Sequence, residues 1–168
     1  MPTTEAHLPP FQTLVDSHTV AVAAFLRGML PRDDVDDALQ ETLLAALRAY
    51  PRFDGANPRA WLLTIARRKA IDEGRAAARR PGGLPEPDAV AAVADVDAAP
   101  SGDSPLWSAV AALPAKQRAA VVLRFAIDLR YRAIGEAMGC SEEAARRSVH
   151  EGVKSLRKSK EIELEVSG

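Results

Sequence analysis

The sequence predicts an all-α protein made of two small helical domains joined by a flexible acidic linker. Of its 168 residues, 47% are hydrophobic and 5% are aromatic, with Ala, Leu, Val and Arg prominent, which favours helices over sheets. Alternating runs of β-branched residues, which are typical of strands, do not occur in the sequence. A stretch rich in Pro, Gly and acidic residues divides the chain into two parts.

Residues 1–80 contain three expected helices. The first covers 14–29, where apolar residues recur at helical spacing. The second starts at Asp33 or Asp34, and a polar loop then leads to a long third helix that begins near Pro58. Residues spaced almost four apart are expected to form the buried face of the second helix: Val35, Leu39, Leu43, Leu47 and Tyr50.

Residues 81–105 form the expected linker. They contain five acidic residues and no basic residue, with repeated Pro, Gly and Ala, although the Ala-rich pieces could hold a helical turn. Fully extended, such a segment reaches at most roughly 80 Å. The two domains could therefore contact DNA sites up to two duplex turns apart, roughly 70 Å.

The second part of the chain ends in a predicted helix-turn-helix corner. Helices are expected over 106–113, 115–125, 131–138 and 141–156. Gly139 suits the positive φ of a sharp turn, and Ser141 suits the N-cap of the last helix. The residues expected to pack the two corner helices together are Ile134, Met138, Ala145 and Val149.

The corner predicts contact with DNA, because three exposed polar side chains follow it. Arg146, Arg147 and His150 are expected to face outward, and Arg can bind guanine or phosphate with two hydrogen bonds. An ordinary solvated helix face with surface arginines is the alternative. The net charge of −1 does not exclude DNA, because basic residues gather over 59–80 and 146–160 while acidic ones gather elsewhere.

Several other classes of protein are not expected. Cys140 is the single cysteine, so no internal disulfide forms, and a small buried filler in the turn is its expected role. The three histidines, His7, His18 and His150, share no ligand spacing, so neither a metal nor a cofactor is expected. No signal peptide and no apolar run of about eighteen residues occurs, which predicts a cytoplasmic protein without membrane insertion. Without a phosphate-binding glycine loop or a nucleophile beside a base, neither an enzyme nor a small-molecule substrate is expected.

Two longer motifs carry a family resemblance. DDVDDALQETLLAALRAYPRFD followed by NPRAWLLTIARRKAID resembles region 2 of the extracytoplasmic-function (ECF, group IV) sigma-70 family of bacterial RNA polymerase sigma factors. LPAKQRAAVVLRFAIDLRYRAIGEAMGCSEEAARRSVHEGVKSLRK resembles region 4 of the same family. The resemblance implies region 2 over 1–80, the linker over 81–105 and region 4 over 106–168. Together the motifs cover nearly the whole chain apart from its ends and the linker.

The resemblance implies core RNA polymerase, with its β′ and β subunits, as a partner. In the family, the polar face of the second helix docks on the coiled coil of the β′ subunit. The matching residues here are Asp36, Asp37, Gln40, Glu41 and Leu44. Charged rims of this kind set orientation and association rate. Without the resemblance, a solvated helix face would explain them as well.

The resemblance implies promoter DNA as the second partner. The third helix and the loop before it would open the minus-ten element and receive a flipped base. The matching residues are Asp54, Asn57, Arg59, Trp61, Arg67, Arg68 and Lys69. Trp61 has two interpretations, a core residue packed with Ile65 or a platform on which a base stacks.

Region 4 would bind the minus-thirty-five element. Arg146, Arg147 and His150 would enter the major groove, and the residues near phosphates would be Lys154, Arg157 and Lys158. Glu151 and Gly152 depart from the family pattern, since a carboxylate repels phosphates and Gly weakens a helix by up to about 1 kcal/mol. The departures leave the preferred minus-thirty-five sequence open.

The sequence therefore predicts an alternative sigma factor. It would bind core polymerase, direct promoter-specific initiation without catalysis of its own, and be controlled by an anti-sigma factor as its relatives commonly are. The alternative is a dimeric helix-turn-helix repressor, which would bind a palindromic operator without polymerase.

Overall fold

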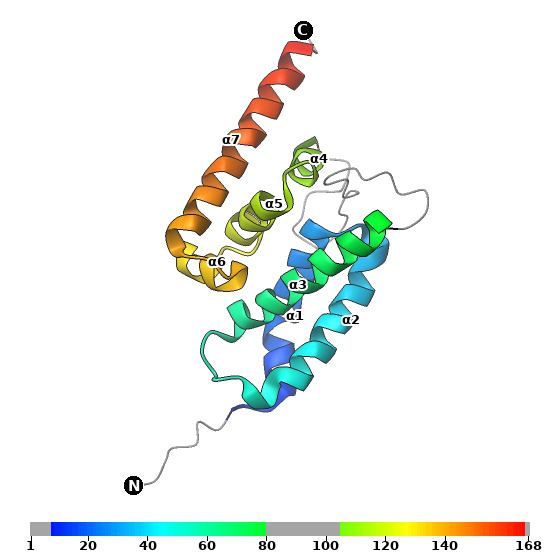
Figure 1. Ribbon diagram of the computed structural model, residues 1–168, viewed down its shortest axis with the longest axis vertical. Helices are drawn as coiled ribbons and strands as arrows, with labels where there is room; N and C mark the ends of the chain where they lie inside the picture. The colour runs from blue at the N-terminus through cyan, green and yellow to red at the C-terminus, as the bar shows by residue number, and fades with distance from the viewer. Residues whose placement is uncertain (1–7, 80–104, 167–168) are drawn as a thin grey trace.

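The computed structural model describes residues 8–79 and 105–166 of the chain (Figure 1). Every regular element in these two ranges is helical, and no strand occurs within them. The all-α prediction is confirmed. Apart from Pro105, the predicted linker lies outside the described residues.

The first part is a three-helix bundle. It consists of α1 (Phe11–Met29), α2 (Arg32–Ala49) and α3 (Pro58–Arg79), with a short 3₁₀ turn η1 (Tyr50–Arg52) after α2. Each pair of these helices is in contact, and Figure 1 shows α3 lying along both of its partners. The third helix begins at Pro58 as predicted, where a fixed φ and a missing N–H suit a helix start.

The buried face of α2 differs from the prediction. Leu47 is 50% exposed and Leu39 and Leu43 are only half-buried, whereas the fully buried residues are Val35, Ala38, Thr42 and Ala46. An α-helix turns by about 100° per residue, so a strict four-residue repeat drifts by about 40° at each step. Leu47 lies three such steps from Val35 and has rotated by about 120°, out of the core.

The second part contains four helices, as predicted. They are α4 (Pro105–Ala111), α5 (Ala115–Val121), α6 (Tyr131–Met138) and α7 (Glu142–Val166). One unpredicted π-helical turn, η2 (Val122–Ala126), continues α5. The buried Arg118 of α5 donates from Nη2 to the carbonyl oxygens of Ala111 at 2.5 Å and Leu113 at 2.9 Å, which fixes the end of α4.

The helix-turn-helix corner between α6 and α7 is confirmed. Gly139 has a φ of 66°, and Ser141 Oγ accepts the N–H of Ala144 at 3.1 Å. All four residues expected to pack the corner are buried: Ile134, Met138, Ala145 and Val149. Cys140 packs against the same core but is half-buried rather than buried.

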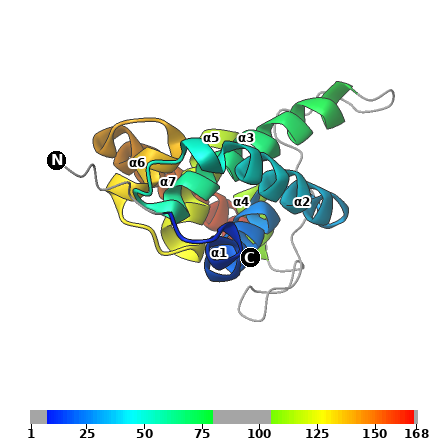
Figure 2. The ribbon, with the colours of Figure 1, turned by 90° about the horizontal axis from the view of Figure 1, so that it is seen from below.

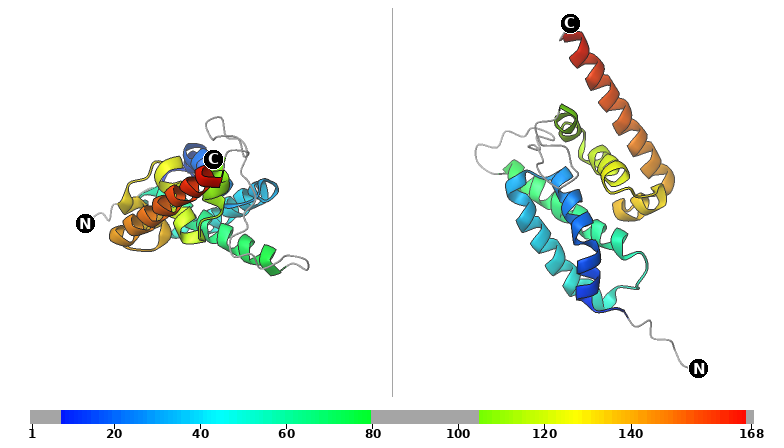
Figure 3. Two further views of the ribbon diagram at one scale, coloured as in Figure 1. Left: turned by 90° about the horizontal axis from the view of Figure 1, so that it is seen from above. Right: turned by 180° about the vertical axis from the view of Figure 1, so that it is seen from behind.

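The two parts of the chain pack against each other, which the sequence did not predict. Helix α6 contacts α3, and both α5 and η2 contact α1, so one hydrophobic cluster runs through both parts. The views from below and from behind show the same packing (Figures 2 and 3). Gly28 of α1 makes the approach possible, since a Cβ built there would lie 2.7 Å from Val122 Cγ1.

Candidate polymerase and nucleic-acid interfaces

An exposed acidic strip runs along α2. The structure brings together the five residues predicted to bind polymerase, and all of them are exposed: Asp36, Asp37, Gln40, Glu41 and Leu44. Leu44 is 46% exposed, and Leu47, one helical turn further on, extends the apolar surface beside it. Sequence reasoning missed Leu47 because it assigned this residue to the core. We call these six residues the α2 strip.

The α2 strip touches the basic residues of α3 at one point. Lys69 Nζ lies 3.9 Å from Glu41 Oε2, and both side chains are partly exposed. A surface ion pair of this length adds little stability. It nevertheless turns Lys69 toward α2 rather than toward its neighbours Arg67 and Arg68.

The basic residues predicted on α3 therefore do not form one face. Three successive helical residues are spread over about 200° of the circumference. Arg68 is exposed, whereas Arg67 and Lys69 are half-buried on either side of it. The structure thus separates these three residues, and Arg68 is the most accessible to a ligand.

The loop before α3 is shaped by two of the predicted minus-ten residues. Asp54 Oδ1 accepts the N–H of Ala56 at 2.9 Å, and Asn57 Oδ1 accepts the N–H of Ala60 at 3.2 Å. The second bond caps the start of α3. Asn57 has a φ of 41°, a left-handed conformation that Asn adopts more readily than most residues. Asp54 and Asn57 are therefore needed to form the loop, whatever else they contact.

Trp61 packs inside an aromatic cluster. Its ring stacks on Phe53 at a centroid distance of 4.4 Å and lies 6.4 Å from the ring of Tyr50. Trp61 is half-buried and packs against the hydrophobic core. Of the two interpretations of Trp61, the structure favours the core residue, because one ring face is already covered.

Two predicted minus-ten residues contact the helix-turn-helix part of the chain. Asn57 Nδ2 donates to Glu136 Oε2 at 2.8 Å, and Arg59 Nη2 donates to the carbonyl of Ile127 at 2.8 Å. Thr64 Oγ1 adds a longer bond of 3.3 Å to the carbonyl of Glu136. We call these three bonds the contact between the two parts. No sequence signal indicated them, because the partners lie far apart along the chain.

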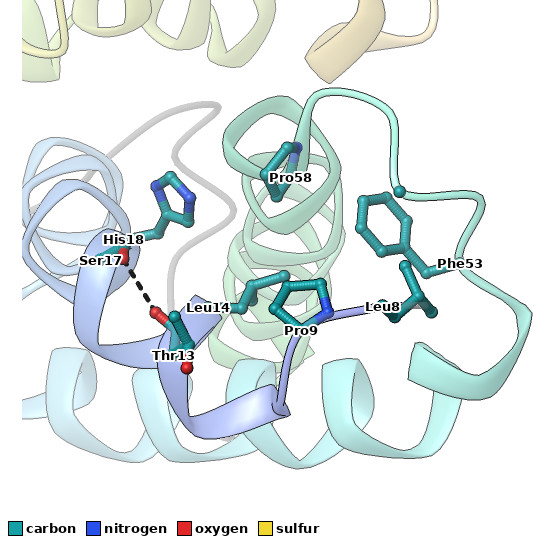
Figure 4. A pocket seen from close by; sticks show the side chains of 9 residues that line it. Leu8, Pro9, Thr13, Leu14, Ser17, His18, Phe53 and Pro58 are labelled. Carbon is teal, nitrogen blue, oxygen red and sulfur yellow. Dashed lines mark hydrogen bonds between the residues drawn. The ribbon is translucent and has the colours of Figure 1, made fainter. Parts of the chain in front are cut away.

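A small cavity of about 140 Å³ lies beside the loop that precedes α3 (Figure 4). Leu8, Leu14, Phe53 and Pro58 line it with apolar surface, and His18 of α1 borders it. Burial, and then the positive charge of Arg59, lower the pKa of His18 below its ordinary value. Both effects favour the neutral form of His18 beside the loop.

Helix α7 presents a basic stripe. All six residues predicted for the minus-thirty-five element are exposed, and the helical turn of about 100° per residue places them within about 120° of one face. They are Arg146, Arg147, His150, Lys154, Arg157 and Lys158. A continuous stripe of this kind fits the phosphate backbone and the major groove. Glu151 is exposed at the edge of this stripe.

Gly152, which departs from the family pattern, has a packing role that sequence reasoning missed. It is buried, and a Cβ built on it would lie 2.6 Å from Val121 Cγ2 and 3.4 Å from the carbonyl oxygen of Gln117. Only Gly allows α5 to approach α7 this closely. The departure therefore serves the core of this part of the chain.

Comparisons with known proteins match both halves of the chain. The family model described as Sigma-70 region 2 matches residues 14–80. The family model described as Sigma-70, region 4 matches residues 104–156. Among curated relatives, the ECF RNA polymerase sigma factor ShbA of Streptomyces griseus is 34% identical over 75% of this chain and 71% of its own length. This chain belongs to the ECF sigma factors. ECF sigma factor SigF of Caulobacter vibrioides is 36% identical over 80% of this chain and 75% of its own length.

Solved structures of sigma factors share the fold. The sigma factor RpoE from Bartonella quintana, in complex with the anti-sigma factor NepR, superposes with a TM-score of 0.75 at 23% identity, over 90% of this chain and 97% of that one. CnrH, in complex with the cytosolic domain of CnrY, gives a TM-score of 0.66 at 27% identity, over 90% of this chain and 88% of that one. The fold of this sigma factor is therefore that of known sigma factors.

The described residues offer neither a cluster of metal ligands nor a membrane-spanning helix. In residues 8–79 and 105–166, no His, Cys, Asp and Glu side chains cluster in a way that could hold a metal ion. Within the same ranges, no helix is both long enough and apolar enough to cross a membrane.

Proposed function

We propose that this ECF sigma factor binds core RNA polymerase through the α2 strip and then recognises promoters through α3 and α7. The basic stripe on α7, which follows a complete helix-turn-helix corner, is the observation that carries the DNA-binding half of this proposal. The α2 strip carries the other half, because acidic side chains beside exposed Leu44 suit a basic helical partner.

Each of the two family regions has its own binding role in this proposal. Residues 1–80 bind polymerase and open the minus-ten element, residues 106–168 bind the minus-thirty-five element, and residues 81–105 link them. The chain contributes binding but no catalysis, and it acts in the bacterial cytoplasm, associated with the nucleoid while bound to polymerase. Both sets of basic residues serve DNA, with Arg68 the most accessible on α3.

An anti-sigma factor is the proposed regulator. The related sigma factor RpoE was solved in complex with the anti-sigma factor NepR. In this chain, three large apolar residues remain 46%, 50% and 65% exposed: Leu44, Leu47 and Phe125. Exposed apolar residues in both parts of the chain give an inhibitory protein anchors on each of them.

Run-off transcription with purified core polymerase tests the proposal. Templates come from the region upstream of the gene that encodes this chain. Wild-type protein should yield specific transcripts, and the double charge reversal Asp37→Arg, Glu41→Arg should abolish them by removing core binding. Asp16→Arg is the matched control, because it reverses an exposed acidic residue on α1, outside the α2 strip.

The outcome separates the sigma factor from the repressor. Transcripts that depend on Asp37 and Glu41, but not on Asp16, support the proposal. If wild-type protein gives neither transcripts nor core binding, and instead protects a palindrome on its own, the chain is a repressor and the proposal is wrong.

A further inference from the structure

The ring of Tyr131 joins three elements of the helix-turn-helix part of the chain. Tyr131 is the first residue of α6, is half-buried and packs against the hydrophobic core. The guanidinium carbon of Arg124, from η2, lies 4.8 Å from the ring centroid. That of Arg146, from α7, lies 5.0 Å from it. Both distances are within the range in which a cation is attracted to an aromatic ring.

The two arginines differ in what else holds them. Arg124 Nη1 donates to the carbonyl of Leu129 at 3.0 Å, which fixes this side chain within the fold. Arg146 Nη2 donates to Glu142 Oε1 at 3.2 Å, and the Arg146 side chain stays 59% exposed. Arg146 is therefore held by two neighbours and still open to a ligand.

The neighbouring arginine has no such support. Arg147 is exposed, and within residues 8–79 and 105–166 it makes no hydrogen bond, ion pair or ring contact. Free arginine side chains lose rotamer entropy of up to about 2 kcal/mol when they are ordered, and a pre-oriented one loses less. Arg146 should therefore lose less side-chain entropy on DNA binding than Arg147 does.

We infer that Tyr131 is a positioning residue that orients Arg146 for the minus-thirty-five element. The inference rests on the proposed function, since it assumes that α7 binds DNA. The hydrophobic core fixes the Tyr131 ring, and the ring and Glu142 together orient the guanidinium of Arg146. The N–H donors of Arg146 are then already oriented to bind a base edge or a phosphate. A substitution that removes the ring should act on DNA binding through Arg146 alone.

A double-mutant cycle tests this coupling. The assay measures the promoter concentration at half-maximal initiation, and the maximal rate, for polymerase loaded with the full-length chain. Tyr131→Leu should weaken promoter affinity about two- to fivefold, the usual strength of an exposed cation–ring contact. In the Arg146→Ala background the same change should have no further effect, whereas in the Arg147→Ala background it should keep its full effect.

Two control variants and two further measurements separate positioning from a structural role. Tyr131→Phe keeps the ring and should bind like wild type. Arg146→Lys keeps the charge but loses the planar guanidinium, so this surface change should cost more affinity when Tyr131 is present than in Tyr131→Leu. The maximal rate should stay unchanged, because the residues proposed to open DNA lie on α3. In the free protein, Tyr131→Leu should remove the ring-current shift of the Arg146 side-chain protons.

Each result points to one conclusion. Equal losses from Tyr131→Leu in the wild-type and Arg146→Ala backgrounds would overturn the inference, and a loss in Tyr131→Phe would assign the effect to the hydroxyl instead. Either result, obtained while wild-type protein still transcribes, leaves the proposed function standing. If wild-type protein itself gives no promoter-specific transcript, the proposed function fails first and the inference fails with it.

Discussion

Replacing Gly28 by Ala should separate the two parts of the chain. A Cβ at this position would lie 2.7 Å and 2.8 Å from the two methyl carbons of Val122. Ordinary contacts begin at 3.4 Å, so the atoms must move apart by 0.7 Å, the difference between 3.4 and 2.7 Å, to restore an ordinary contact. Val122 is buried and β-branched, so its side chain cannot rotate away.

The magnitude follows from overpacking. Forcing one methyl group into a packed interface costs about 1–3 kcal/mol. Ala also favours the helix more than Gly does, but this gain cancels, because α1 is helical whether or not the two parts are in contact. The full cost therefore falls on the packing between the parts and shifts the ratio of separated to packed molecules by about 5- to 150-fold.

Distance measurements between two spin labels can detect the shift. Arg48 on α2 and Ser159 on α7 are both exposed, and each can be replaced by a labelled Cys once Cys140→Ser has removed the native thiol. Wild-type protein should give one narrow distance distribution. Gly28→Ala should add a longer and broader population.

Gly74→Ala is the matched control. It makes the same chemical change on α3, where an added Cβ meets no atom within 4 Å. The control should leave the distances unchanged. If Gly28→Ala also keeps the single narrow distribution, then the two parts accommodate a methyl group without separating, and the reasoning from close packing is wrong.

Three further predictions concern stability and can be checked by urea denaturation of the full chain. Gly152→Ala should destabilise the protein by about 1–2 kcal/mol, because overpacking of α5 against α7 exceeds the higher helix propensity of Ala. Gly74→Ala, which meets no neighbouring atom, should stabilise it by about 0.5–1 kcal/mol. Equal stabilisation by both substitutions would contradict the packing role of Gly152. Leu47→Ala should cost less than about 1 kcal/mol, as expected for a half-exposed side chain, whereas a core leucine would cost about 2–5 kcal/mol. His18 binds a proton less readily in the folded protein than in the unfolded chain, so its contribution to stability is complete above its ordinary pKa of 6.5 and is lost as the pH falls below that value. His18→Gln should therefore lose less stability than wild type between about pH 7.5 and 5.5, and identical pH profiles would contradict the burial of His18 beside Arg59.

The features that the sequence predicted correctly are the local ones. Gly139 and Ser141 define the corner through their own backbone and side-chain chemistry, so residues that are adjacent in the sequence suffice to predict it. Leu47 was assigned to the wrong face because a four-residue repeat was treated as if it matched the 3.6-residue turn of a helix. That error could have been avoided from the sequence alone.

The missed features depend on residues far away in the chain. The close approach at Gly28 and at Gly152 involves Val122 and Val121, and no local pattern indicates which residue faces a glycine. The bond between Asn57 and Glu136 likewise joins two residues from different parts of the chain. Such contacts arise from tertiary packing, which composition and periodicity do not encode.

The acceptor that Arg59 uses in the contact between the two parts affects how readily an anion could replace it. Arg59 donates to a backbone carbonyl, which carries no net charge, and its Nε is buried without a hydrogen-bond partner among the described residues. An anionic oxygen attracts the guanidinium through its net charge as well as through a hydrogen bond, whereas a carbonyl oxygen carries no net charge. A phosphate that reaches Arg59 would therefore compete with this carbonyl for the Nη2 donor. The same exchange would take the Arg59 donor away from the carbonyl of buried Ile127, so the contact sets a cost that an anion must exceed.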